Sequence, residues 1–508
     1  MIYTPVSYNR MDTILFLSVL TRRYLLMAAM VVVFSDAMAQ RLTLSDAITI
    51  ARENSLDAKI SRYSYMSSYW QYRSFKAQLM PSVNIGGKLG GFNHSVVEAR
   101  DPETGRVNLV NNNTMTNSVT LSVDQQIAAT GGKVSLQSYL YRLDQFTYNE
   151  KTYNSQPLRI SYTQPLRSFN TLKWEKKTAP VEFRIAERTY ITALQDITIK
   201  VTQLFFNVLS AQSDYRQSMQ TVSDRERLYE VAQKRLALTT TTKSEVLQME
   251  LSLLNARMAV TKNKITLDDA MYELFSYLRV TDYSLAELIP PYTVPDMTVS
   301  VDEVLQKAIT NSSHSLEQKL QMLQAEKELA QAKSSRGIQM TLSSELGFTQ
   351  TGHTIDAAYS RLRANEIIGL PLSLPIFDWG VSRGRVKMAQ ARLDMVRTKV
   401  EQTHMDYMQD LRKKVTQFNA QPQQCRNALR AQDIAEERYE ITRRRYETGA
   451  ISVTDLNTAQ QEMESAKAQY ISQLKTFWND YYTLQKSTLH DWQSGRDITV
   501  DFDEVMRL

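Results

Sequence analysis

The 508-residue sequence is short of several residue types, and each shortage excludes a class of protein. The single cysteine, Cys425, excludes an intrachain disulfide and lies too far along the chain to be a lipid-anchor cysteine. The five histidines are scattered without the close spacing of a metal site, so we expect no metal and no cofactor. With only 15 glycines and 12 prolines, the composition favours long helices over a series of small β domains.

Long apolar runs are also missing after the N-terminal region. There, two arginines precede an apolar run from Tyr24 to Phe34, and Ala37-Met38-Ala39 places small residues where a signal peptidase reads. We therefore predict a signal peptide over residues 1–39, cleaved after Ala39. No later stretch approaches the roughly 20 consecutive apolar residues of a transmembrane helix. An exported chain of this kind is either free beyond the membrane or inserted as a β-barrel.

Strong charge asymmetry and catalytic motifs are absent as well. The formal net charge is +6, and the basic residues are spread along predicted helices, which indicates solvated faces and no nucleic-acid partner. Gly131-Gly132-Lys133 lacks the rest of a phosphate loop, and no nucleophile elbow or zinc-protease motif occurs. We therefore expect no catalytic residues and no enzymatic activity.

What the sequence does contain is an internal repeat. Residues 42–90 align with residues 299–347 at a constant offset of 257 without a gap, and the sequence Lys-Val-Thr-Gln at 200–203 recurs at 414–417. Such self-similarity indicates one structural unit used twice. We predict a first repeat over residues 40–290, a linker over 291–298, a second repeat over 299–490 and a C-terminal tail over 491–508.

Each repeat changes its hydrophobic period from that of a strand to that of a helix. Ile368, Leu370 and Leu372 alternate with small or polar residues, whereas Val386 and Leu393 begin a seven-residue apolar repeat. Pro375 marks this strand-to-helix junction, and Pro165 marks the corresponding junction of the first repeat. We predict strands at about 82–164 and about 338–376, and long helical hairpins at about 171–282 and about 381–487.

The predicted strands number four in the first repeat and two in the second. The sequence does not decide whether the extra pair, near residues 119–164, joins the same sheet. Six strands are too few for one chain to close a channel, because the smallest single-chain barrels have about eight. Four long helices likewise cannot cover their apolar seams alone. Several copies sharing one barrel would satisfy both requirements, and their assembly would be a conduit.

This plan resembles the TolC-like outer-membrane efflux protein family. The resemblance is carried by the junctions Gln164-Pro165-Leu166 and Leu374-Pro375-Ile376-Phe377, and by the helical tip Arg445-Tyr446-Glu447-Thr448-Gly449-Ala450-Ile451-Ser452-Val453-Thr454-Asp455-Leu456. It implies a mainly α fold with a membrane β-barrel contribution, in which duplicated helix–strand–helix units build a trimeric α-barrel of long coiled hairpins topped by a shared β-barrel. It implies a homotrimer in the bacterial outer membrane, with its helical part in the periplasm. The implied partners are outer-membrane lipid, a periplasmic adaptor (membrane fusion) protein and an inner-membrane transporter of RND or ABC type.

The resemblance also assigns roles to residues at the helical tips. It places adaptor docking at Arg445, Tyr446, Gly449, Ala450 and Ile451 of the second repeat, and at Arg235, Leu236 and Thr239 of the first. Thr239 stands where the second repeat has Gly449, so we expect a less constrained turn there. Asp455 matches the first of two acidic residues, three apart, that can form charged rings at the pore constriction, and Thr458 occupies the second position. Asp455 has an alternative role as an acidic residue favourable to the start of its helix.

The family implies a passive exit duct rather than an enzyme. We expect the outer-membrane channel of a tripartite efflux system for small molecules such as drugs and toxic compounds. The alternatives are the exit duct of a type I protein secretion system, and an exported coiled-coil scaffold that never inserts. The sequence does not identify the cargo or the partner pump.

Overall fold

The computed structural model describes residues 41–100, 102–281, 287–448 and 450–507. The predicted signal peptide and its cleavage site at Ala39 lie outside these residues. The described chain forms two compact units. The helical unit contains the described residues up to Ser64, Thr189–Ser312 and those from Met408 onward; the sheet unit contains Tyr65–Arg188 and Ser313–Tyr407. Each unit therefore combines segments of both sequence repeats.

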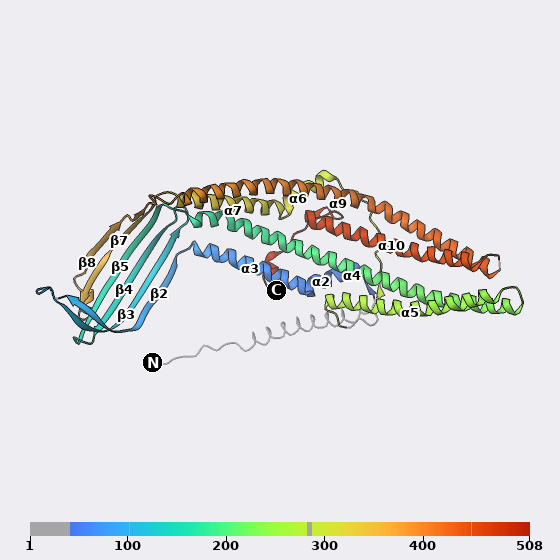
Figure 1. Cartoon of the computed structure of the whole chain (residues 1–508), viewed down its shortest axis with the longest axis horizontal. Coiled ribbons are helices and arrows are strands. Elements are labelled where there is room, and N and C mark those ends of the chain that lie inside the picture. The colour runs from blue at the N-terminus through green and yellow to red at the C-terminus, as the bar shows by residue number, and fades with distance from the viewer. Residues whose placement is uncertain (1–40, 101, 282–286, 449, 508) are drawn as a thin grey trace, which may run out of the picture. The chain divides into compact units, whose positions relative to one another are not determined.

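Both repeats run from two helices through a set of strands to a long helical hairpin (Figure 1). The first repeat contains α2 (Leu44–Asn54), α3 (Leu56–Gln78), β2 (Ser82–Arg100), β3 (Val107–Ile127), β4 (Gly132–Gln145), β5 (Glu150–Arg167), α4 (Thr171–Ala237) and α5 (Lys243–Leu278). The second contains α6 (Val301–Asn311), α7 (His314–Ser335), β7 (Gln339–Gly352), α8 (Ile355–Tyr359), β8 (Arg363–Gly369), β9 (Leu372–Ser373), α9 (Val381–Glu447) and α10 (Val453–Thr488). Among the described residues, no helix is both long enough and apolar enough to cross a membrane.

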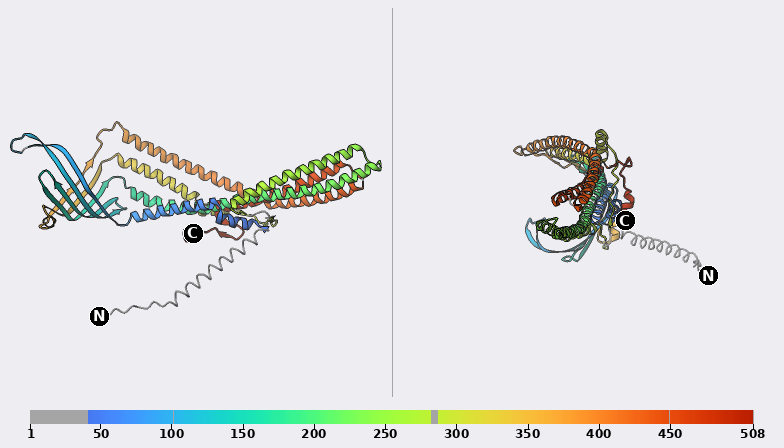
Figure 2. Two further views of the ribbon diagram at one scale, coloured as in Figure 1. Left: turned by 90° about the horizontal axis from the view of Figure 1, so that it is seen from below. Right: turned by 90° about the vertical axis from the view of Figure 1, so that its right-hand side faces the viewer.

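The sheet unit contains one antiparallel sheet in the order β2-β3-β4-β5-β7-β8. The short β9 pairs with β7 beside β8, so β8 and β9 together occupy one strand position. The extra strand pair of the first repeat therefore does join the same sheet, and β5 pairs with β7 to connect the two repeats. Figure 2 shows the same strands from two further sides.

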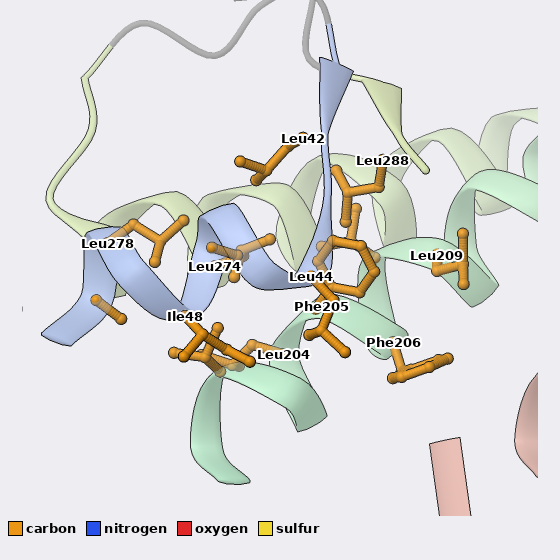
Figure 3. Close-up of a cluster of buried hydrophobic side chains, with 14 of the residues drawn as sticks. Leu42, Leu44, Ile48, Leu204, Phe205, Phe206, Leu209, Leu274, Leu278 and Leu288 are labelled. Carbon is orange, nitrogen blue, oxygen red and sulfur yellow. The ribbon is translucent and has the colours of Figure 1, made fainter. Parts of the chain in front are cut away.

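The core of the helical unit lies where α4 and α5 meet the start of the described chain (Figure 3). Phe205 and Phe206 of α4 are fully buried and pack in one cluster with Leu274 and Leu278 of α5 and Leu44 of α2. Two short strands, β1 (Arg41–Leu42) and β6 (Glu287–Leu288), pair in parallel above this cluster. Burial of five such side chains contributes on the order of 10 kcal/mol in transfer free energy, which fixes α2 against α4.

The C-terminal segment is part of the helical unit. It contains β10 (His490–Asp491), β11 (Arg496–Asp497) and the short helix α11 (Phe502–Arg507). The two strands form an antiparallel hairpin. Arg62 of α3 donates through Nε to the carbonyl oxygen of Val505 at 3.1 Å, and the centre of the Phe502 ring lies 6.2 Å from that of Tyr190. The tail predicted over residues 491–508 is thus structured over its described residues.

Candidate functional site

The two helical hairpins of the helical unit end in short turns, between α4 and α5 and between α9 and α10. In the first turn, the Thr240 amide donates to the carbonyl oxygen of Arg235 at 2.9 Å; in the second, the Ala450 amide donates to that of Arg445 at 3.0 Å. This six-to-one bond is the Schellman closure of a helix C-terminus. Both repeats therefore end their long helices in the same way. Gly449 itself lies outside the described residues.

Thr239 does not loosen the first turn, contrary to our expectation. Its φ is 55°, in the left-handed region that favours glycine. The Thr239 amide donates to the carbonyl oxygen of Leu236 at 3.0 Å, which is the second bond of the Schellman closure. Because these bonds hold the turn, Thr239 keeps a backbone conformation that is strained for a β-branched residue.

Beneath the two turns lies a compact apolar cluster. Tyr446 has a relative exposure of 0% and packs there with Leu228, Val246, Met249 and Leu456, from all four helices of the two hairpins. The Arg235 guanidinium lies 6.0 Å from the centre of the Tyr446 ring. Burial, followed by the nearby charge of Glu245, raises the pKa of Tyr446. The side chain of Tyr446 is therefore a packing element of the tip in this conformation.

The other predicted tip residues are nearer the surface. Arg445, Ala450 and Thr239 are exposed, while Arg235, Leu236 and Ile451 are partly exposed. Leu238, which the sequence did not single out, is 70% exposed at the first turn. The exposed Leu238 of the first turn and the exposed Arg445 of the second give the tips both apolar and cationic surface.

Asp455 lies in the first turn of α10 and forms a capping box with Ser452. The Asp455 amide donates to Ser452 Oγ at 3.2 Å, and the Ser452 hydroxyl donates to Asp455 Oδ2 at 2.8 Å. The alternative role of Asp455 at its helix start is thus present in the structure. The carboxylate is nevertheless exposed, as is Thr458, whose hydroxyl donates to the carbonyl oxygen of Thr454 at 3.0 Å. Residues three apart share a helix face, so both side chains lie on one exposed face.

Polar contacts connect α4 to α9 above the tips. Tyr439 donates its hydroxyl to Oδ2 of Asp224 at 3.2 Å, and Arg443 Nη1 lies 3.7 Å from Oδ1 of the same carboxylate. Nearer the turn, Arg227 forms an ion pair with Glu447 at 2.9 Å. Burial, with the Asp224 charge next in effect, raises the pKa of the Tyr439 hydroxyl, which therefore remains a donor at neutral pH.

A second set of polar contacts connects α4 to α10. The buried Arg225 guanidinium donates to Gln460 Oε1, and Gln460 Nε2 donates to Thr221 Oγ1 at 3.1 Å and to Glu464 Oε1 at 2.8 Å. Burial lowers the pKa of Arg225, but an arginine remains protonated at neutral pH. Removal of Gln460 would leave the buried Arg225 charge without this hydrogen-bond acceptor. We therefore expect a large loss of folding stability.

Sequence reasoning missed these polar contacts. The positions 218, 221, 225, 228 and 232 follow the three-and-four spacing of a helix seam, and the last two are Leu228 and Ala232. Arg225 and Ser218 are buried at the same seam. Polar residues at the positions where an apolar seam would continue are the sequence pattern that predicts such buried polar contacts. Near the tips, α4 is thus connected to both α9 and α10 by polar side-chain contacts.

Comparisons with known proteins agree with this architecture. The sequence profile of the family described as outer membrane efflux protein matches residues 47–278 and 304–488, one segment in each repeat. Outer membrane protein TolC of Escherichia coli (strain K12) is 24% identical over 341 residues, covering 63% of this chain and 67% of the relative. The protein of the same name from Salmonella enteritidis is 24% identical over 339 residues with the same coverage.

Solved structures show the same fold at low sequence identity. The CmeC outer membrane channel of Campylobacter jejuni is 15% identical with a TM-score of 0.62, covering 91% of this chain and 88% of its own. The outer membrane protein VceC of Vibrio cholerae is 14% identical with a TM-score of 0.61, covering 88% of this chain and 95% of its own. The long helical hairpins and the attached sheet are thus the predicted fold. The chain belongs to the outer membrane efflux protein family.

Proposed function

We propose that this chain is one subunit of a homotrimeric outer-membrane channel, the passive exit duct of a tripartite efflux system for small molecules. The observation that carries the proposal is an antiparallel sheet whose two edge strands, β2 and β8, each have one partner among the described strands. The edge strand β2 carries exposed apolar side chains, such as Ile85 with a relative exposure of 77%. An exposed, partly apolar edge of this length calls for pairing with another chain.

The direction of the strands allows a closed ring. Six antiparallel strand positions place β2 and β8 in opposite directions, so β8 of one copy can pair antiparallel with β2 of the next. Three copies then form one barrel without a free edge, which is the only form in which a sheet spans a lipid bilayer. The sheet unit would contact outer-membrane lipid, and the helical unit would extend into the periplasm.

The helical tips supply the other end of the proposed duct. Arg445, Ala450 and Ile451, with Gly449, would dock the periplasmic adaptor, together with Arg235, Leu236 and Thr239 of the first turn. Tyr446, being buried, would support this surface from below. Asp455 and Thr458 would line the constriction, where three Asp455 carboxylates around one axis would attract cations. An inner-membrane transporter of RND or ABC type would supply the energy, because the proposed duct is passive.

Efflux is proposed in preference to type I protein secretion because the matched family is described as an efflux family. Deletion of the gene in its own host separates the two. Raised sensitivity to small toxic compounds, with secreted proteins unchanged, is the expected result. Loss of one or more proteins from the culture medium without a change in sensitivity would reassign the duct to secretion.

The channel itself is tested with the full-length protein expressed in a Gram-negative host. We expect it in the outer-membrane fraction, as a trimer by native mass spectrometry, and conducting in planar lipid bilayers. A monomer released with the periplasmic fraction, giving no conductance, would overturn the proposal in favour of an exported scaffold.

A further inference from the structure

The first repeat holds a strand pair that the second repeat lacks. Equivalent positions are 257 residues apart at Ser82 and Gln339, where β2 and β7 begin, but only 210 apart at Pro165 and Pro375, where the strands end. The first repeat therefore carries 47 more residues between these points. This is the length of two strands and their turns, and the first repeat indeed has four strand positions where the second has two.

The additional strands are paired along both of their sides. By this alignment β2 corresponds to β7, and β5 to β8 with β9, so the additional strands are β3 and β4. β3 pairs with β2 from Val107 to Asp124. β4 pairs with β3 from Gly132 to Gln145, over its whole length, and with β5 from Lys133 to Gln145. β5 pairs in turn with β7, from Tyr153 opposite Gly352 to Arg167 opposite Met340 (Figure 1). Strands with such ladders on both sides are part of the sheet and not a flap or plug lying against it.

One face of the sheet is apolar across the additional strands. Directly opposed residues share a face, and Val83, Val123, Leu136, Ile160 and Leu346 oppose one another in turn across β2, β3, β4, β5 and β7. Val123 and Leu136 lie on the additional strands, and Leu136 is 43% exposed, close to the 44% of Ile160 on β5. The same row of apolar side chains thus runs without a break through the additional strands and their neighbours, and no described residue of the sheet unit covers it fully.

The opposite face is polar across the same strands. Lys133 Nζ lies 3.1 Å from Oδ1 of Asp124, joining β4 to β3. Arg159 Nε donates to Gln137 Oε1 at 3.1 Å, and Arg159 Nη1 lies 3.3 Å from Oε1 of Glu345, joining β5 to β4 and β7. Alternation of an apolar and a polar face is the pattern of a membrane barrel wall, with lipid on one side and water on the other.

We propose that β3 and β4 are wall strands of the outlet, so that each copy contributes six strands and the barrel of the trimer contains 18. This inference rests on the homotrimer of the proposed function. An even number of strands in each copy keeps every contact antiparallel, including those between copies. Without the additional pair, the same trimer would close with 12 strands.

The number of strands sets the width of the outlet. With strands about 4.8 Å apart and tilted by about 40°, 18 strands give a backbone diameter of about 36 Å and 12 strands about 24 Å. Side chains occupy about 5 Å of each radius, which leaves an open radius of about 13 Å or about 7 Å. Barrels of 16–18 strands leave an aqueous channel. The outlet therefore admits bulky hydrophilic solutes that a 12-stranded barrel excludes.

Cysteine labelling tests whether the additional strands line the wall. Cys425 is the only cysteine, so single cysteines are introduced in a Cys425→Ser background. On β3, Gln126→Cys lies on the polar face and Val123→Cys on the apolar face; on β7, Ser343→Cys and Leu346→Cys are the matched pair. A membrane-impermeant maleimide should label Gln126→Cys and Ser343→Cys in proteoliposomes, and the other two only after the bilayer is dissolved. Labelling of both β3 cysteines in water, with normal alternation on β7, would overturn the proposal.

The width is tested separately, by polymer exclusion in planar bilayers and by counting strands in an electron cryomicroscopy map of the wild-type trimer. Poly(ethylene glycol) of hydrodynamic radius about 10 Å, added on the side of the strand loops, should enter and lower the conductance. A trimer with 12 wall strands that excludes this polymer would refute the inference and leave the proposed function intact. A protein that neither trimerises nor inserts would refute both.

Discussion

Arg159 of β5 and Glu345 of β7 form an ion pair at 3.3 Å across the strand contact that joins the two sequence repeats. Each side chain is 27% exposed, so the pair is only partly screened by solvent. Arg159 also donates to Gln137, which extends the contact to a third strand. The pair therefore stabilises the sheet where β5 of the first repeat pairs with β7 of the second.

A double-mutant cycle measures this contribution. Arg159→Gln and Glu345→Gln should each lower the free energy of unfolding, and the double variant should lose less than the sum of the two. We expect a coupling free energy of about 0.5–1 kcal/mol, because the pair is partly exposed. Urea unfolding in detergent gives the values. The solvent-exposed pair Lys264 and Asp268 on α5 is the control, with coupling near zero. Equal coupling in both pairs would contradict a special role for the strand contact.

The join between the repeats also marks the limit of what the sequence could predict. The change of hydrophobic period predicted that the long helices begin at about residues 171 and 381, and α4 and α9 begin at Thr171 and Val381, because periodicity is a local property. The pairing of β5 with β7 joins residues nearly 190 apart, and the alternation of either strand would look the same with another partner. Membership of the extra strands in the sheet therefore had to come from the structure.

At the tips, too, the local turn could be predicted from the sequence, whereas the burial of individual side chains could not. A turn at Thr239 was predicted, and Thr239 lies between the end of α4 at Ala237 and the start of α5 at Lys243. Burial of Tyr446 and of Arg225 depends on which helix packs over them, and each is covered by a helix distant in sequence. Docking and pore roles at the tips remain predictions.

Replacing Thr239 by glycine should stabilise the first tip. Its φ of 55° strains a β-branched residue, whereas glycine adopts this conformation without a steric cost. We expect the free energy of unfolding to rise by about 1 kcal/mol, measured by urea unfolding of the full-length protein in detergent. The neighbouring Thr240→Gly is the control: Thr240 donates its hydroxyl to the carbonyl oxygen of Arg235 at 3.0 Å, so its loss should lower stability. A fall in stability for both variants would mean that Thr239 is not strained.

Acid should weaken the attachment of the C-terminal hairpin. Hydrogen bonds from Lys307, and also from His490 and Asn311, lower the pKa of Asp497 to about 2 although partial burial opposes this. A carboxylate whose folded pKa is depressed stabilises the fold above its unfolded pKa of about 4, and this stabilisation is lost as the pH falls toward 2. Asp497→Asn should therefore unfold with a shallower pH dependence between pH 4 and pH 2. The exposed Asp503→Asn should keep the wild-type slope, and an unchanged slope for Asp497→Asn would exclude this contribution.

The two roles of Asp455 can be separated by a pair of variants. Asp455→Asn removes the charge, whereas Ser452→Ala breaks the capping box and leaves the Asp455 carboxylate in place. Loss of the cap should cost Ser452→Ala about 1 kcal/mol of stability. If three Asp455 carboxylates line the constriction, only Asp455→Asn should weaken the block of planar-bilayer conductance by divalent cations, because the attraction depends on their charge.

Thr458 offers the complementary gain of function. It is exposed and lies one turn further along the same face of α10, so Thr458→Asp should add a second acidic ring and strengthen the divalent-cation block. The carboxylate of Thr458→Asp is too far along the helix to replace the cap, so its effect should persist in the Ser452→Ala background. Unchanged block in both Asp455→Asn and Thr458→Asp would place the constriction elsewhere and leave Asp455 with its capping role alone.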